Sequence, residues 1–137
     1  MKWLNQFLRL SAEEKKVFIE AAFIMYFSKI YLFLPFRLCI RTLKPAAYFT
    51  NPVSVEEITK IRAAIYRANK LACWKNTCLV KSFAARLMLQ HRGIGSVMYL
   101  GLRIKDGKEL VAHAWLCSEG IYVTPKLSSE YKELFKI

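Results

Sequence analysis

Two residues in this chain have the types and settings that thiol catalysis requires. Cys78 lies in Trp-Lys-Asn-Thr-Cys-Leu-Val-Lys (74–81), where a helix is expected to begin, and His113 lies in the apolar run Val-Ala-His-Ala-Trp-Leu (111–116). Unpaired amides and the helix dipole stabilise a thiolate at a helix N-terminus, and a nearby imidazole can take the thiol proton. The chain has two histidines and a single aspartate, Asp106, so it offers few other groups for chemistry. Cys78 and His113 are therefore the candidate nucleophile and general base.

Each setting also has a purely structural interpretation. A cysteine in an apolar helix is often a small core residue, and a histidine in an apolar strand is often a buried group with its hydrogen bonds satisfied. Trp74 and Trp115 could line a substrate groove or pack in the core. Asn76 and Thr77 are candidate N-caps of the helix that begins near Cys78, and the first amides of that helix could form an oxyanion hole. Spacing alone leaves both interpretations open.

Capping signals and hydrophobic periodicity predict the helices that must position these residues. The capping box Ser11-Ala-Glu-Glu14 opens one helix, and Ser54-Val-Glu-Glu57 opens another. Pro35 should interrupt the apolar N-terminal region, and Gly93 is placed to be a left-handed C-cap. Helices are thus expected over 12–34, 36–43, 55–71 and from 77 or 78 to 91, with connectors over 44–52 and 72–76.

The pattern changes to strands after residue 95. Strands are expected over 96–104, 110–117 and 121–124, and Asp-Gly in the segment 105–108 supplies the positive φ values of a tight hairpin turn. The tail over 125–137 is polar and is expected to form at most a short helix. Helices followed by a small antiparallel sheet predict an α+β fold. The length of 137 residues suits a single domain over 1–137, with a helical N-terminal half over 1–50 and a Cys–His core over 51–137.

The net charge of +12 lies almost entirely before residue 93. Such a field favours an acidic partner, namely a peptide, a nucleic acid or an anionic membrane surface, or it serves the solubility of a chain that is 55% hydrophobic. We expect no nucleic-acid function, because the chain has no zinc-finger spacing, no RNA-binding aromatic motif and no isolated basic helix.

The apolar region from Val17 to Leu38 could be mistaken for a membrane span. Charged residues interrupt it, and its longest uncharged helical stretch, 21–28, is far shorter than the roughly 20 residues that a span needs. No secretory signal is evident. The four cysteines, at 39, 73, 78 and 117, fit neither a disulfide framework nor a zinc spacing. We therefore expect reduced thiols, a cytoplasmic protein, and no metal or cofactor.

Three segments together resemble one family. The segments 74–84, 87–94 and 112–116, with Leu-Pro-Phe after an apolar helix at 34–36, are similar to the transglutaminase-like leader peptidases of lasso-peptide biosynthesis, in their stand-alone form. The resemblance covers about residues 12–124. It implies a papain-like cysteine protease core that removes the leader from a ribosomally made precursor peptide. A separate lasso cyclase then forms the macrolactam, and a separate small leader-binding recognition protein captures the precursor.

The chain departs from that family at the third catalytic residue. Members often place an aspartate about twelve residues after the histidine, where this chain has Pro125 preceded by Thr124. Asp106 lies in the hairpin turn, roughly 20 Å along the strand from His113. The imidazole could be oriented by Thr124, by Glu119, by an amide side chain or by a backbone carbonyl. The alternative function is a non-catalytic scaffold of the same fold that binds the precursor or the cyclase.

Overall fold

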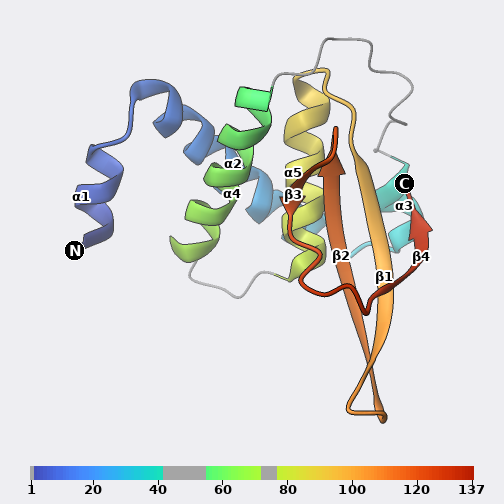
Figure 1. The fold of residues 1–137 in the computed structure, drawn as a ribbon. Coiled ribbons are helices and arrows are strands. Elements are labelled where there is room, and N and C mark those ends of the chain that lie inside the picture. Colours follow the sequence, from blue (N-terminus) through green and yellow to red (C-terminus); the bar gives the residue numbers. More distant parts are fainter. Residues whose placement is uncertain (1, 42–54, 72–76) are drawn as a thin grey trace.

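The structure is a computed structural model that describes residues 2–41, 55–71 and 77–137 (Figure 1). The helices are α1 (Lys2–Leu8), α2 (Ala12–Tyr31), α3 (Phe36–Ile40), α4 (Val55–Leu71) and α5 (Cys78–His91). The strands are β1 (Val97–Lys105), β2 (Glu109–Ser118), β3 (Ile121–Thr124) and β4 (Lys132–Lys136). The predicted α+β class is confirmed.

Local signals explain where the helices begin and end. The Ser11 hydroxyl accepts from the Glu14 amide and the Glu14 carboxylate accepts from the Ser11 amide, so the predicted capping box opens α2. That helix ends at Tyr31, three residues earlier than expected, because the chain turns before Pro35. Helix α1 was not predicted, and both predicted connectors, together with Ser54, lie outside the described residues.

The expectation for the C-terminal tail was wrong. A strand, β4, takes the place of the short helix and pairs antiparallel with β1. Ile137 and Met98 exchange two backbone hydrogen bonds of 2.9 Å, so this end of the tail satisfies the free side of β1. The Arg86 guanidinium from α5 also donates to the Ile137 oxygen. The tail was misjudged because a strand of this kind depends on a distant partner and not on local propensity.

The sheet is antiparallel with the order β3-β2-β1-β4. In the turn between β1 and β2, Asp106 and Gly107 both have positive φ, as the Asp-Gly signal predicted. The β1–β2 hairpin projects well past the end of α5 that begins at Cys78 (Figure 1). After β3 the chain crosses in front of β2 and β1 to reach β4 (Figure 1).

Helix α5 lies in the centre of the molecule, between the sheet and the pair α2 and α4 (Figure 1). It is buried on nearly all sides, because both layers pack on it. The largest of its buried apolar side chains, Phe83, Met88 and Leu89, join residues of α2, α4 and the sheet in one core. Burial also lowers the pKa of Arg86, which stays inside through its contact with Ile137. Close packing on both sides therefore holds the helix that carries Cys78 in a fixed position.

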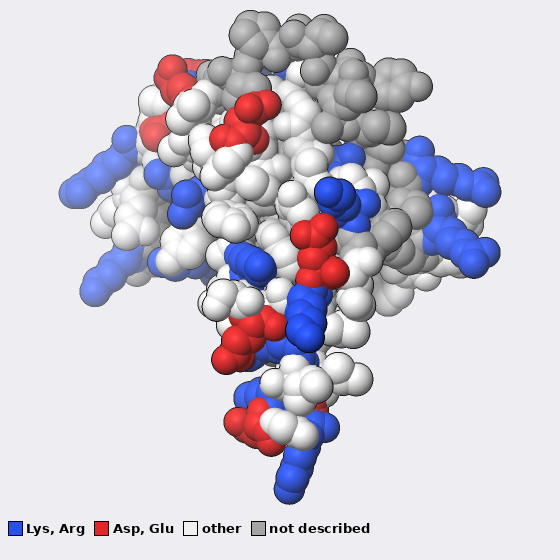
Figure 2. Space-filling view, turned by 45° about the vertical axis from the view of Figure 1, so that its right-hand side comes forward, with Lys and Arg blue, Asp and Glu red and all other residues white. Residues whose placement is uncertain are grey.

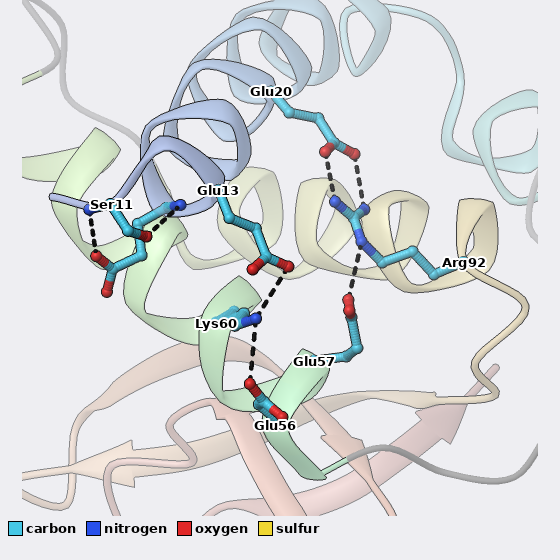
Figure 3. A network of polar contacts seen from close by, with 8 residues as sticks. Ser11, Glu13, Glu20, Glu56, Glu57, Lys60 and Arg92 are labelled. Atoms are coloured by element: carbon cyan, nitrogen blue, oxygen red, sulfur yellow. Dashed lines mark hydrogen bonds and ion pairs between the residues drawn. The ribbon is translucent and has the colours of Figure 1, made fainter.

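A polar network links helices α2, α4 and α5 at the surface (Figure 3). Arg92, which ends α5, donates to both carboxylate oxygens of Glu20 on α2 and pairs with Glu57 on α4 at 3.3 Å. Lys60 on α4 bridges Glu13 and Glu56. Within the described residues, no helix has the length and apolarity that a membrane crossing would require.

Candidate active site

Cys78 is the first residue of α5, and Thr77 is its N-cap. The Thr77 hydroxyl accepts from the amide of Val80, and the Thr77 carbonyl accepts from the amide of Lys81. Helix geometry leaves the amides of Cys78 and Leu79 without intrahelical acceptors, so they can serve an anion at this end. The thiol thus lies where the partial positive charge of the helix is greatest.

The thiol reaches the side of β2 that β3 leaves open. Strand β3 pairs only with the residues from Leu116 to Ser118, although β2 begins at Glu109. The amides of Leu116 and Ala114 point to the same side, because residues two apart on a strand repeat their hydrogen-bonding direction. Beyond the end of β3, the Ala114 amide donates to Cys78 Sγ at 3.4 Å. The sulfur is therefore beside the peptide group that joins Ala114 to His113.

A buried hydroxyl pair holds this edge together. Thr124 Oγ1 accepts from the Leu116 amide at 2.8 Å and lies 2.8 Å from Ser82 Oγ. Ser82, one turn after Cys78 on α5, also donates to the Ala114 carbonyl at 3.3 Å. Both hydroxyl side chains are almost wholly buried. The hydrogen bonds of Ser82 and Thr124 hold α5 and β3 against the same stretch of β2. They therefore fix the position of Cys78 along that strand.

His113 Nε2 lies 2.7 Å from the Pro125 carbonyl oxygen. A carbonyl only accepts, so Nε2 carries the proton and Nδ1 of the neutral ring keeps its lone pair. Pro125 also has no amide to donate to β2, so the ladder between β2 and β3 cannot continue past Thr124. The same residue therefore ends the pairing and supplies the acceptor for the imidazole.

Aromatic rings enclose the imidazole on the outer face of the sheet. The Tyr131 ring is 5.0 Å from that of His113, and the Trp115 ring is 5.9 Å away and nearly parallel to it. Gly101 of β1, which pairs with His113 of β2, makes room for Trp115, since a Cβ there would come within 2.8 Å of the Trp115 ring and of a backbone oxygen. The ring of His113 is thereby held in one orientation.

The predicted site residues divide into three groups. Thr77, Cys78 and His113 converge on the edge of β2 near Pro125. Trp115 is buried, with Tyr99 stacked on its ring and the Lys126 ammonium over it, so it forms the wall behind His113. Trp74 and Asn76 lie outside the described residues.

The weaker candidates for orienting His113 lie elsewhere. Glu119 is exposed in the turn between β2 and β3, roughly 20 Å along the strand from His113. The Thr124 hydroxyl bonds to Leu116 and Ser82, while the carbonyl of the next residue meets the imidazole. Of the options that the sequence left open, the backbone carbonyl has the contact.

Sequence reasoning missed two residues at this site. Ser82 could have been found, because a serine four residues after Cys78 lies on the same helical face as the thiol. Tyr131 carried no signal, because only the crossing of the chain to β4 brings it over His113. The three described cysteines, Cys39, Cys78 and Cys117, form no disulfide with one another. Among the described residues no group of side chains has the composition and spacing to hold a metal ion.

Comparison with known protein families identifies the superfamily of the chain. A profile of the transglutaminase-like superfamily matches residues 23–136, which include both Cys78 and His113. The chain belongs to the transglutaminase-like superfamily. This transglutaminase-like domain shares its superfamily with cysteine peptidases, whose chemistry uses a thiol and an imidazole. Neither the curated proteins nor the solved structures contain a match to it.

Proposed function

We propose that this protein is a cytoplasmic cysteine peptidase that removes the leader from a ribosomally made lasso-peptide precursor before a separate cyclase forms the macrolactam. The observation that supports the proposal is that a helix-capped thiol and a tautomer-fixed imidazole lie along one open strand edge: Cys78 Sγ accepts from the Ala114 amide, and the preceding residue, His113, donates from Nε2 to the Pro125 carbonyl. The substrate class rests on the resemblance of the segments around these two residues to that family of peptidases.

The proposed mechanism starts from His113 with its proton on Nε2, which leaves Nδ1 able to act as a base. Once the imidazole approaches Sγ, His113 Nδ1 accepts the Cys78 proton and the thiolate attacks the scissile carbonyl. The first amides of α5 then stabilise the oxyanion of the tetrahedral intermediate. The imidazolium returns its proton to the leaving amine, which leaves a thioester on Cys78. A water molecule, deprotonated by Nδ1, hydrolyses the thioester and restores the thiol.

The Pro125 carbonyl has a distinct part in this scheme. It orients the ring and fixes the tautomer, as a carboxylate would, but it brings a dipole and no full negative charge. The imidazolium that forms during catalysis is therefore stabilised less than beside an aspartate. We expect a slow peptidase, and this fits an enzyme whose precursor is delivered to it by a separate recognition protein.

The outward face of α2 is the candidate docking surface for that small leader-binding partner. Large apolar side chains repeat along α2 at helical spacing and continue into the turn that follows it; Phe23 in the helix and Phe33 in the turn are 71% and 84% exposed. The full set is Ile19, Phe23, Tyr26, Phe27, Ile30, Phe33 and Leu34.

The charges of α2 and of the whole chain indicate which kind of partner this surface would bind. The three carboxylates of α2, on Glu13, Glu14 and Glu20, are engaged by Lys60, by the Ser11 cap and by Arg92 (Figure 3). The carboxylates of the helix are thus already paired or capped, and two copies of a +12 chain would repel each other. An acidic partner with its own apolar anchors is therefore the complement.

The decisive experiment is incubation with a candidate lasso-peptide precursor, with and without a candidate recognition protein, with leader removal read by mass. Cys78→Ala and His113→Ala should abolish leader removal while leaving the far-ultraviolet circular dichroism unchanged. Cys117→Ala is the matched control, because Cys117 is also a free, partly buried thiol, on β2. The control should cleave at the wild-type rate.

Two further outcomes would redirect the proposal. Normal cleavage by either site variant would exclude the Cys–His mechanism. Binding of precursor or cyclase without any cleavage would favour the scaffold function. For the partner surface, Phe23→Ala should weaken binding of the recognition protein about tenfold or more. Tyr66→Ala, at a site on α4 that is 62% exposed, should leave that binding unchanged.

A further inference from the structure

The projecting half of the β1–β2 hairpin has an apolar face that extends beyond the helices. On the side that faces α5, the cross-strand pairs run Met98–Leu116, Leu100–Ala114, Leu102–Ala112 and Ile104–Leu110. Met98 and Leu116 are fully buried under α5, whereas Ile104 and Leu110 are 64% and 69% exposed. One continuous apolar surface thus passes from the core to solvent, and the change occurs where α5 begins at Cys78.

Figure 2 shows this hairpin at the bottom of the molecule, with uncharged residues between interspersed basic and acidic side chains. Charges of both signs keep the hairpin soluble without giving it a strong field. Exposed apolar residues of this size, aligned in one row on a strand pair, are a feature of binding surfaces. The mixed charge argues against an anionic membrane as the ligand of this part of the molecule.

The same hairpin has an open hydrogen-bonding edge. Strand β3 pairs no further along β2 than Leu116. The next residue of β2 whose backbone groups point to that side is Ala114, whose amide donates to Cys78 Sγ and whose carbonyl accepts from Ser82 Oγ. The backbone groups of Ala112 and Leu110 point to the same side by the two-residue repeat of the strand. In the described part of the chain, no strand pairs with them on that side.

We propose that the open edge of β2 over residues 109–113, with the exposed apolar face of the hairpin, is the substrate-binding subsite, and that it holds an extended peptide as an added strand. The inference rests on the proposed peptidase function. A strand added here would run directly toward Ala114, where Cys78 Sγ accepts from the amide. Main-chain hydrogen bonds would supply affinity, and alternate side chains of the peptide would lie on Leu110 and Ile104.

The geometry favours a peptide over other occupants. Unpaired amides and carbonyls at strand spacing complement a main chain and no other common ligand. The edge is continuous with the candidate nucleophile, so a bound strand has its next peptide bond near the thiol. A second copy of this chain would place two strongly basic molecules together, and it would block the thiol on both.

Backbone methylation of the substrate gives the sharpest test. The probe is a synthetic, fluorescein-labelled peptide that spans the leader–core junction of the precursor, with binding to the Cys78→Ala protein measured by anisotropy. A set of probes has one N-methyl group moved along the peptide. Since alternate amides of an added strand point to β2, affinity should fall about tenfold at every second position and change little at those between. A flat profile would overturn the inference.

Variants of the protein supply the second arm. Leu110→Glu should weaken binding of the unmethylated probe and raise KM about tenfold, with kcat nearly unchanged. Leu134→Glu is the matched control, because Leu134 is 66% exposed on β4 at the opposite edge of the sheet. Equal effects of the two substitutions, or none at Leu110, would contradict the proposed subsite. Each variant should retain the wild-type circular dichroism.

The outcomes separate this inference from the proposed function. If Cys78-dependent cleavage occurs but neither the methyl scan nor Leu110→Glu shows the expected pattern, the function stands and the subsite is wrong. If no cleavage occurs and the methyl scan still shows its period of two, the edge binds peptides and the peptidase function fails. A dimer in sedimentation that Leu110→Glu dissociates would instead assign the edge to a second copy and overturn the inference.

Discussion

Replacing Thr124 with valine should destabilise the fold by about 2 kcal/mol, because the Thr124 hydroxyl satisfies two buried groups. Its oxygen accepts from the Leu116 amide and is bonded to Ser82 Oγ, both at 2.8 Å. Valine keeps the shape of threonine and removes only the hydroxyl. A buried amide left without an acceptor costs about 1–3 kcal/mol.

Two smaller terms refine that figure. Ser82 keeps its bond to the Ala114 carbonyl, so the loss of its partner at Thr124 adds only about 0.5–1.5 kcal/mol. The added methyl group recovers up to about 0.8 kcal/mol of burial. The net loss is therefore about 2 kcal/mol, a large share of the roughly 5–15 kcal/mol by which a domain of this kind is stable.

Urea unfolding followed by tryptophan fluorescence measures this loss. The matched control is Thr59→Val on the exposed surface of α4, where the hydroxyl only bonds back to the Val55 carbonyl. The control should change the free energy of unfolding by no more than about 0.5 kcal/mol. A second comparison uses Ser82→Ala, which removes the other half of the hydroxyl pair.

The double variant tests whether the two hydroxyls act together. Because their mutual bond is lost in either single variant, Thr124→Val with Ser82→Ala should cost about 0.5–1.5 kcal/mol less than the sum of the two. Strict additivity would show that the pair is not bonded. A Thr124→Val protein as stable as Thr59→Val would refute the buried bridge itself, and with it the account of what holds β2, β3 and α5 in register.

Three other perturbations test separate contacts. Gly101→Ala should cost about 1–3 kcal/mol and change the near-ultraviolet circular dichroism, since its Cβ collides with the Trp115 ring. Arg92→Lys should cost about 1–2 kcal/mol in urea unfolding, because lysine cannot make the two-pronged contact with Glu20. The Ser11 amide lowers the pKa of the Glu14 carboxyl from 4.5, so the stabilisation by this group is present above pH 4.5 and is lost as the pH falls through its folded pKa. The stability difference between wild type and Glu14→Ala should accordingly shrink on acidification, and a constant difference would count against the cap.

The fold could be predicted where signals are local. The Ser11–Glu14 capping box, the Asp-Gly turn and the left-handed Gly93 are each decided by a few neighbouring residues, and the described helices that were predicted and the first three strands lie close to the expected ranges. Strand β4 could not be predicted in this way, because it exists through its pairing with β1. Helix α1 is short and lacks a capping signal, so nothing in the sequence marked it.

In the candidate site, too, the residues with local signals could be predicted and those that depend on distant contacts could not. The settings of Cys78 and His113 were visible, because a helix start and an apolar strand leave local patterns. The partner of the imidazole was not, because a backbone carbonyl belongs to every residue and its direction depends on the path of the chain. Ser82 could be placed on the helical face of Cys78 from the sequence, but its bond to the Ala114 carbonyl, like the contact of Tyr131 with His113, depends on residues more than ten positions away.

Pro125 links the two proposals made for this site. A residue with an amide at this position could have extended the ladder along β2, and the edge beside Ala114 would then be covered. Proline cannot donate, so β3 ends at Thr124, the edge stays open, and the carbonyl of Pro125 is available to His113. The peptidases that the chain resembles often have an aspartate at this position, so with proline here the imidazole has a carbonyl dipole beside it and no full negative charge. The same proline leaves the strand edge next to the thiol open, so the absence of a carboxylate beside the imidazole and the open edge that the proposed subsite requires have one cause.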